Sequence, residues 1–205
     1  MIKTHDCKIF VIDDDESVRK GISLLLSSGG YHVETFENAK DFLASDNGKG
    51  PGCILLDIFL DGVSGLELQD VIKEKFSNLP IIFITGHGDV PMSVRALKKG
   101  ALDFLQKPVA DHELFHAVDE AINQSLVLLN IQQERDSIKS KIDSLTPREF
   151  EIFKYVIKGF LNKQIAFTLN IAEHTVKLHR GRITGKLGVK SVAEMIYMAE
   201  KIHID

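Results

Sequence analysis

The stretch KIFVIDDDES (Lys8–Ser17) decides how the first half of this chain folds. Its apolar residues, Ile9 to Ile12, run directly into three aspartates and a glutamate. A short run of Ile, Phe and Val is typical of a strand that is buried on both faces, as in a parallel sheet. The sequence therefore places Asp13, Asp14 and Asp15 together at the end of a buried strand, where clustered carboxylates need a partner.

The composition is that of an ordinary globular protein. The chain has 205 residues, of which 44% are hydrophobic and 26% are charged, enough for one large domain or two small ones. No apolar run approaches the roughly 20 residues of a membrane helix, and the polar N-terminus MIKTHDCK lacks a secretory core. Cys7 and Cys53 each adjoin a strand-like run. We therefore expect a cytoplasmic protein with buried, reduced thiols and no membrane contact.

The net charge of −4 is unevenly distributed along the chain. Residues 1–143 carry 15 Lys and Arg against 23 Asp and Glu, a net of −8, whereas residues 144–205 carry 10 against 6, a net of +4. An acidic half joined to a basic half indicates two domains that have different partners.

Apolar runs in the first half recur at the spacing of strands that alternate with helices. The runs lie at residues 9–12, 31–36, 53–57, 80–85 and 101–105. The segments between them have helical spacing, and we expect their apolar side chains to face the sheet; these are Val18, Ile22, Leu25, Leu26, Leu66, Val71, Ile72, Met92, Val94 and Leu97. This alternation predicts an α/β fold with a doubly wound five-stranded parallel sheet.

Functional side chains stand at the ends of four predicted strands, at the edge where ligands of such sheets bind. They are Asp13 and Asp14 after the first strand, Asp57 at the end of the third, Thr85 at the end of the fourth and Lys107 after the fifth. Converging carboxylates repel one another unless a cation neutralises them. Oxygen ligands with no His or Cys nearby favour a hard ion, by default Mg²⁺. Asp15 fits a different role, the N-cap of the following helix.

The motifs VIDDD, ILLD, FITG and FLQKP, in this order, resemble the receiver domain of bacterial two-component response regulators over roughly residues 5–125. The resemblance implies a flavodoxin-like fold in which Asp57 accepts a phosphoryl group from a sensor histidine kinase. It implies that Mg²⁺ is held by Asp13, Asp14, Asp57 and the backbone carbonyl of Phe59. It also implies that Thr85 and Lys107 contact the phosphoryl oxygens, that Phe104 is the aromatic switch residue, and that the Lys107-Pro108 bond is cis.

The segment from Ala110 to Asp143 contains neither Gly nor Pro, which predicts a final receiver helix that continues into a helical linker. Its broken apolar repeat leaves open whether the linker self-associates or is a solvated spacer. Four shorter helices follow, with Thr146, Asn162 and Ser191 as the expected N-caps of the first, second and fourth. The tight turn between the second and third is typical of a helix-turn-helix unit.

The third of these helices, HTVKLHRGRITGKLGV (174–189), is basic. No acidic residue lies between Glu173 and Glu194, whereas the segment contains Lys177, Arg180, Arg182, Lys186 and Lys190. Its buried side is predicted to consist of Val176, Ile183 and Leu187. A basic face on the second helix of such a pair predicts docking in the major groove of double-stranded DNA, although a solvated basic face would have the same pattern.

The motifs LTPRE, NKQIA, TVKLHRGRI and KLGVKS resemble the luxR-type DNA-binding domain over residues 144–205, so that the whole chain is similar to the FixJ/NarL family. The resemblance implies that Lys177 and Leu178 lie near bases, and that Gly181 stands where some relatives have a base-contacting residue. Further expected DNA contacts are His174, Thr175, Arg180, Arg182, Lys163 and Lys186. The expected domains are a receiver at residues 1–123, a helical linker at 124–143 and a DNA-binding domain at 144–205.

The expected function is a phosphorylation-dependent, DNA-binding transcriptional regulator and not an enzyme. The phosphorylated form is expected to be a homodimer, and a contact with RNA polymerase is left open. One alternative is a constitutive DNA binder with a receiver that does not switch, because Asp61 stands where many receivers have proline. The other is a Mg²⁺-dependent phosphatase with Asp57 as nucleophile, which Phe59 disfavours by standing where such enzymes have an acid/base aspartate.

Overall fold

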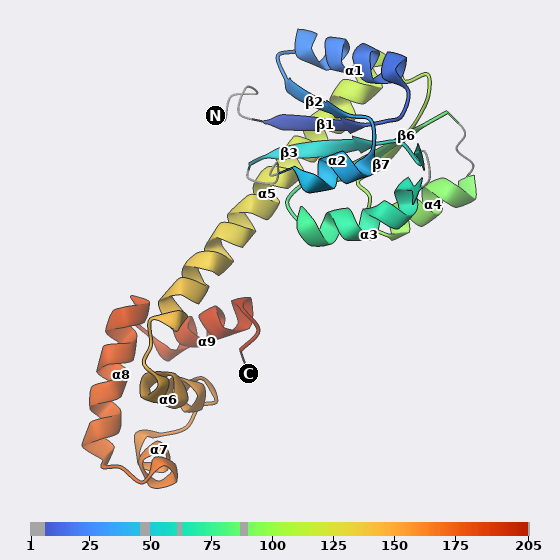
Figure 1. The fold of residues 1–205 in the computed structure, drawn as a ribbon. Helices are drawn as coiled ribbons and strands as arrows, with labels where there is room; N and C mark the ends of the chain where they lie inside the picture. The colour runs from blue at the N-terminus through green and yellow to red at the C-terminus, as the bar shows by residue number, and fades with distance from the viewer. Residues whose placement is uncertain (1–6, 46–49, 61–62, 87–89, 205) are drawn as a thin grey trace. The chain divides into compact units, whose positions relative to one another are not determined.

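The predicted alternation of strands and helices is present in the computed structural model, which describes residues 7–45, 50–60, 63–86 and 90–204. The chain divides into two compact units, residues 1–130 and 131–205 (Figure 1). In the first unit, five parallel strands form one sheet in the order β2-β1-β3-β6-β7. They are β1 (Lys8–Ile12), β2 (His32–Phe36), β3 (Gly52–Leu56), β6 (Ile81–Thr85) and β7 (Asp103–Gln106). Both the fold class and the five predicted strands are therefore confirmed.

Helices cover the two faces of this sheet (Figure 1). One face packs against α1 (Glu16–Ser28) and α5 (Asp111–Asp143), and the other against α2 (Ala39–Ala44), α3 (Gly65–Lys75) and α4 (Val90–Lys98). Successive side chains of a strand point to opposite faces. Ile9 and Val11 accordingly pack with the α1 and α5 residues, whereas Phe10 and Ile12 pack with residues of α2, α3 and α4.

Local signals fix where α1 begins and how closely β1 and β3 approach. Asp15 is the N-cap of α1, because its side chain accepts hydrogen bonds from the backbone amides of Ser17 and Val18. Gly52 of β3 lies against β1 so closely that an added Cβ would be 2.0 Å from the carbonyl oxygen of Lys8. A larger residue at position 52 would therefore push the two central strands apart.

Three predicted core residues lie at the surface instead. Val71 of α3 and Val94 and Leu97 of α4 have exposed fractions of 48%, 41% and 45%. In α4 the side that faces the sheet is formed by Ala96, which is fully buried, and by the partly buried Met92. The helix α4 is therefore present, but the prediction that Met92, Val94 and Leu97 share one face is wrong, because Val94 and Leu97 lie on the outer side of the helix. A second difference is a small antiparallel pair, β4 (Phe59–Leu60) and β5 (Val63–Ser64), which the sequence did not predict.

The second unit is helical and has its own core. It contains the end of α5 together with α6 (Pro147–Ile157), α7 (Asn162–Leu169), α8 (Glu173–Leu187) and α9 (Val192–Lys201). The capping box of Thr146 and Glu149 and the N-cap Ser191 are confirmed. The N-cap of α7 is Leu161 and not Asn162. Leu161 has the extended backbone of a cap, and the Asn162 side chain instead accepts a hydrogen bond from Arg180.

The helix α5 runs without interruption from Asp111 to Asp143, as predicted for the receiver helix and its linker. Within the first unit, the Ser125 hydroxyl lies between the backbone amide of Gly52 and the carbonyl of Asn78, at 3.1 and 2.6 Å. Within the second unit, Ile138 and Ile142 are buried in the core with residues of α6, α8 and α9. The end of the predicted linker is therefore part of the second core.

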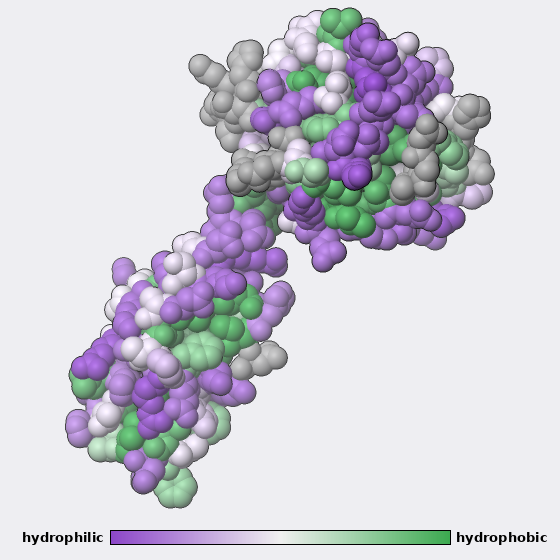
Figure 2. All heavy atoms as spheres, viewed as in Figure 1, coloured by the Kyte–Doolittle hydropathy of each residue, from purple (hydrophilic) through white to green (hydrophobic). Residues whose placement is uncertain are grey.

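Most apolar side chains of the described residues are buried or partly buried in these cores. Figure 2 shows that hydrophilic side chains dominate the visible surface of both units. Over the part of the chain that the structure describes, no helix has the length and apolar character needed to cross a membrane.

Candidate functional site

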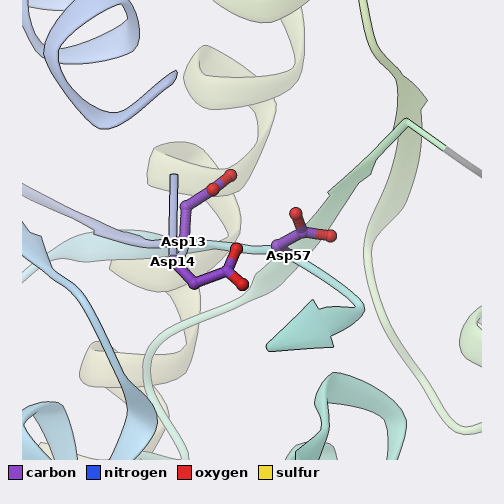
Figure 3. Close-up of side chains that lie close together, drawn as sticks. All are labelled: Asp13, Asp14 and Asp57. Atoms are coloured by element: carbon purple, nitrogen blue, oxygen red, sulfur yellow. The ribbon is translucent and has the colours of Figure 1, made fainter. Parts of the chain in front are cut away.

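Three aspartates gather at the carboxyl ends of the central strands (Figure 3). Asp13 and Asp14 follow β1, Asp57 follows β3, and carboxylate oxygens of all three lie within 4.8 Å of one another. Asp13 and Asp57 are buried, with exposed fractions of 2% and 7%, whereas Asp14 is exposed. The topology produces this cluster, since β1 and β3 are parallel neighbours in the sheet and end at the same edge.

A lysine ammonium links the two buried carboxylates. Lys107, which follows β7, places its Nζ 2.6 Å from Oδ2 of Asp13 and 2.7 Å from Oδ2 of Asp57. The peptide bond between Lys107 and Pro108 is cis, as expected. The lysine can therefore stabilise negative charge on either carboxylate or on an anion that joins them.

Backbone groups hold the same two carboxylates. The amide of Asp15 donates to Oδ1 of Asp13 at 3.0 Å, and the amide of Phe59 donates to Oδ1 of Asp57 at 3.2 Å. Arg19 of α1 donates from Nη1 to the backbone carbonyl of Asp13 at 2.5 Å, a contact that the sequence analysis missed. The signal was present, because α1 starts right after the acidic run and Arg19 lies in its first turn.

The remaining predicted residues of this site lie close by in the sheet. Thr85 ends β6 and is fully buried, and Phe104 of the neighbouring β7 is partly buried against the core. The Phe59 side chain is half exposed. Asp61, at which the sequence departs from the receiver pattern, lies outside the described residues.

Burial and pairing set the protonation of the cluster. Burial raises the pKa of Asp13, although the hydrogen bonds from Lys107 and the Asp15 amide oppose this. Burial alone would lower the pKa of Lys107, but its hydrogen bonds to Asp13 and Asp57 outweigh burial and raise it. Three carboxylates against one ammonium leave an excess of negative charge, and the set contains only oxygen ligands. Such a set fits a hard divalent cation.

Replacing Asp13 by asparagine is expected to stabilise the metal-free protein at neutral pH, by on the order of 1 kcal/mol. The pKa of Asp13 is raised above its usual 3.8 in the folded state. Its stabilising contribution is therefore present below pH 3.8 and lost as the pH rises through the folded pKa. Urea unfolding in EDTA would measure the gain, which should disappear at a pH low enough to protonate the wild-type carboxyl. A lower unfolding free energy for Asp13→Asn in EDTA would contradict this account.

A helix-turn-helix arrangement is present in the second unit. The helices α7 and α8 are joined by a turn at Asn170, whose backbone is left-handed. Val176, Ile183 and Leu187 of α8 are buried, as predicted, and the N-cap Ala172 makes no side-chain cap. The predicted DNA-contacting residues with exposed side chains or backbone are Lys163, His174, Lys177, Leu178, Gly181, Arg182 and Lys186.

The other two predicted DNA contacts are less accessible, and the exposed Lys186 has partners within the unit. Thr175 and Arg180 are partly buried, and Nη1 of Arg180 donates to Oδ1 of Asn162 at 2.7 Å. Nζ of Lys186 lies 2.6 Å from Oε2 of Glu149 and 3.0 Å from the carbonyl of Ser144. This places Lys186 in an ion pair within the unit, which sequence spacing did not reveal because the partners are 37 residues apart.

Glu149 is the buried member of that pair, with an exposed fraction of 3%. Besides Lys186, it accepts a hydrogen bond from the Thr146 amide at 2.9 Å, so it completes the capping box of α6. The hydrogen bond from Lys186 and then that from Thr146 lower the pKa of Glu149 to about 2. One carboxylate thus joins the start of α6 to the end of α8.

A fold with an acidic site at the carboxyl edge, followed by a basic helix-turn-helix unit, defines a signalling receiver joined to a DNA-binding domain. Residues 9–119 match the response regulator receiver domain family, and residues 143–199 match the luxR family of bacterial regulatory proteins. The chain belongs to the two-component response regulators that combine these two domains, the FixJ/NarL family, as predicted.

Relatives and solved structures agree with this assignment. Nodulation protein W of Bradyrhizobium diazoefficiens is 41% identical over 196 residues, which is 96% of this chain and 86% of the relative. The response regulator StyR, for which a structure has been solved, is 42% identical in sequence to this chain, and the two structures match with a TM-score of 0.78. The match covers 96% of this chain and 99% of the StyR chain. The structure of full-length FixJ from B. japonicum matches with a TM-score of 0.58 at 35% sequence identity. This match covers 97% of this chain and 98% of the FixJ chain.

Proposed function

We propose that this response regulator accepts a phosphoryl group on Asp57 from a sensor histidine kinase and then binds DNA as a homodimer. A carboxylate oxygen of Asp57 forms a bond to phosphorus while the bond from phosphorus to the kinase histidine nitrogen breaks, which gives an aspartyl phosphate. The chain itself is then the substrate and switch and has no separate catalytic activity.

The observation that carries this proposal is the shared contact of Lys107 with Asp13 and Asp57. The ammonium already lies 2.7 Å from the proposed acceptor, so it can stabilise the oxygens that phosphorylation adds. Asp13, Asp14, Asp57 and the Phe59 carbonyl would hold Mg²⁺, which supplies charge neutralisation for the phosphoryl group. Thr85 and Phe104, on the neighbouring strands β6 and β7, are the proposed switch residues.

The test is to incubate the full chain with acetyl phosphate and Mg²⁺ and to record its intact mass and its oligomeric state. We expect a single phosphoryl adduct, accompanied by a shift from monomer to dimer in light scattering. EDTA should prevent both changes, because three neighbouring carboxylates repel an incoming phosphate when no cation is bound. An adduct formed equally well in EDTA would contradict the role of Mg²⁺, and the absence of any adduct would contradict the proposal.

The affinity for DNA should fall as the salt concentration rises, and each lysine that contacts a phosphate should add to the steepness of this fall. Lys163 is exposed on α7, so Lys163→Ala should lower the slope of log affinity against log salt by about 1 if it contacts a phosphate. Lys139→Ala, which removes the same charge from the exposed side of α5, is the control and should leave the slope unchanged. Fluorescence anisotropy with one duplex at several salt concentrations measures both. Equal slopes for Lys163→Ala and the wild type would remove Lys163 from the interface.

A further inference from the structure

Two histidines, whose imidazole side chains are common metal ligands in proteins, lie at the start of α5, away from the three aspartates. The sequence there is HELFH (112–116), with two histidines four residues apart and a glutamate after the first. Residues four apart in a helix lie on one face with Cβ atoms about 5–6 Å apart, so both imidazoles can reach one ion. Leu114, between them, is buried in the core, which leaves His112 and His116 on the exposed side of α5.

Both histidines line an open cavity of about 760 Å³ between α5 and β7. The described lining also contains the carboxylates of Asp103 and Glu113, and it contains no lysine or arginine. The acidic residues Asp111 and Glu113 also offset the positive end of the helix dipole in this first turn. The cavity therefore has a local charge that attracts cations and two ligands that bind transition metals.

We propose that His112 and His116 form a site for Zn²⁺, with Asp103 or Glu113 and water completing the coordination. Imidazole nitrogen is a preferred ligand of zinc and a poor one for Mg²⁺, so this site and the aspartate cluster select different ions. Over the described ranges, Asp13, Asp14 and Asp57 are the one group of three such residues with ligand atoms within 4.8 Å. A third protein ligand at the histidine pair thus requires a side-chain rotation, which makes the site open and of moderate affinity.

Zinc bound by His112 and His116 would lie next to a strand of the receiver sheet. Phe104 and Gln106 of β7 line the same cavity, so an ion held by His112 and His116 would place a positive charge beside that strand. The two histidines and the glutamate repeat the H-E-x-x-H pattern of zinc peptidases. In this chain the pattern lies in the exposed first turns of α5, and we propose that it binds zinc without catalysing peptide hydrolysis.

The test is calorimetric titration of the full chain with ZnCl₂ in excess Mg²⁺, joined by NMR of the histidine side chains. We expect one Zn²⁺ per chain, with ring signals of His112 and His116 that shift together. His112→Ala and His116→Ala should each weaken binding by at least about tenfold. The matched control is His32→Ala on β2, also exposed and next to a carboxylate, which should bind zinc like the wild type.

Two results would overturn the site. One is the absence of zinc binding in excess Mg²⁺, and the other is unchanged binding in the variant that lacks both His112 and His116. The Asp57→Asn variant should bind zinc normally; zinc binding that is lost in this variant would mean that the aspartate cluster holds the ion. The phosphorylation test has a different readout, so either proposal can fail without the other.

Discussion

Asp57→Asn is expected to abolish the phosphoryl adduct completely under conditions in which the wild type is fully converted. The amide is a far weaker nucleophile than a carboxylate, so the bond to phosphorus cannot form at this position. The substitution changes few atoms and leaves Lys107 with its other partner, Asp13, at 2.6 Å, so we expect the fold to persist. Intact mass after incubation with acetyl phosphate and Mg²⁺ measures the effect, and circular dichroism checks the fold.

The matched control for this experiment is Asp70→Asn on the exposed side of α3. Asp70 pairs with Lys99 at 2.6 Å at the surface and is not part of the aspartate cluster. This variant should be phosphorylated like the wild type. A phosphoryl adduct on Asp57→Asn at undiminished yield would show that another residue is the acceptor.

Glu149→Gln is expected to destabilise the DNA-binding unit by about 2–3 kcal/mol at neutral pH, because it removes the charge of a buried carboxylate that accepts hydrogen bonds from Lys186 and from the Thr146 amide. The pKa of Glu149 is lowered from its usual 4.5 to about 2. Its contribution is therefore present above pH 4.5 and lost as the pH falls from 4.5 to about 2. The difference in stability between wild type and variant should shrink over this window. Urea unfolding monitored by NMR signals of the second unit would measure it.

Glu151→Gln provides the control two residues further along α6. Glu151 pairs with Arg148 at 2.6 Å, but both side chains are more than one third exposed. Surface pairs of this kind contribute about 0–1 kcal/mol. Equal losses of stability in the two variants would contradict the special role assigned to Glu149.

Short-range signals in the sequence predicted most of this fold. The strand ends that carry Asp13, Asp57 and Thr85 were visible as apolar runs that stop at a polar residue, and the N-caps Asp15, Thr146 and Ser191 were identified from single residues. These features depend on neighbours within a few positions. The parallel topology then brings the strand ends together without further information.

Features that depend on tertiary packing were missed or wrong. The outward direction of Val94 and Leu97 follows from which side of α4 meets the sheet, and helical periodicity does not specify that side. The pairing of Glu149 with Lys186 joins residues of α6 and α8, and no local pattern marks it. Asn162 has the right chemistry for an N-cap, but Arg180 binds its side chain.

The shared helix α5 has a practical consequence for chimeric regulators, in which the receiver of one protein is fused to the output domain of another. A junction at residue 143 would separate Ile138 and Ile142 from the core to which they belong. It would also remove Glu134, which pairs with Tyr197 and Lys201 of α9 at 2.9 and 3.0 Å. The exposed residues 130–133 follow the Ser125 anchor and precede Glu134. A fusion made there would keep Ser125 with the receiver, and Glu134, Ile138 and Ile142 with the second unit.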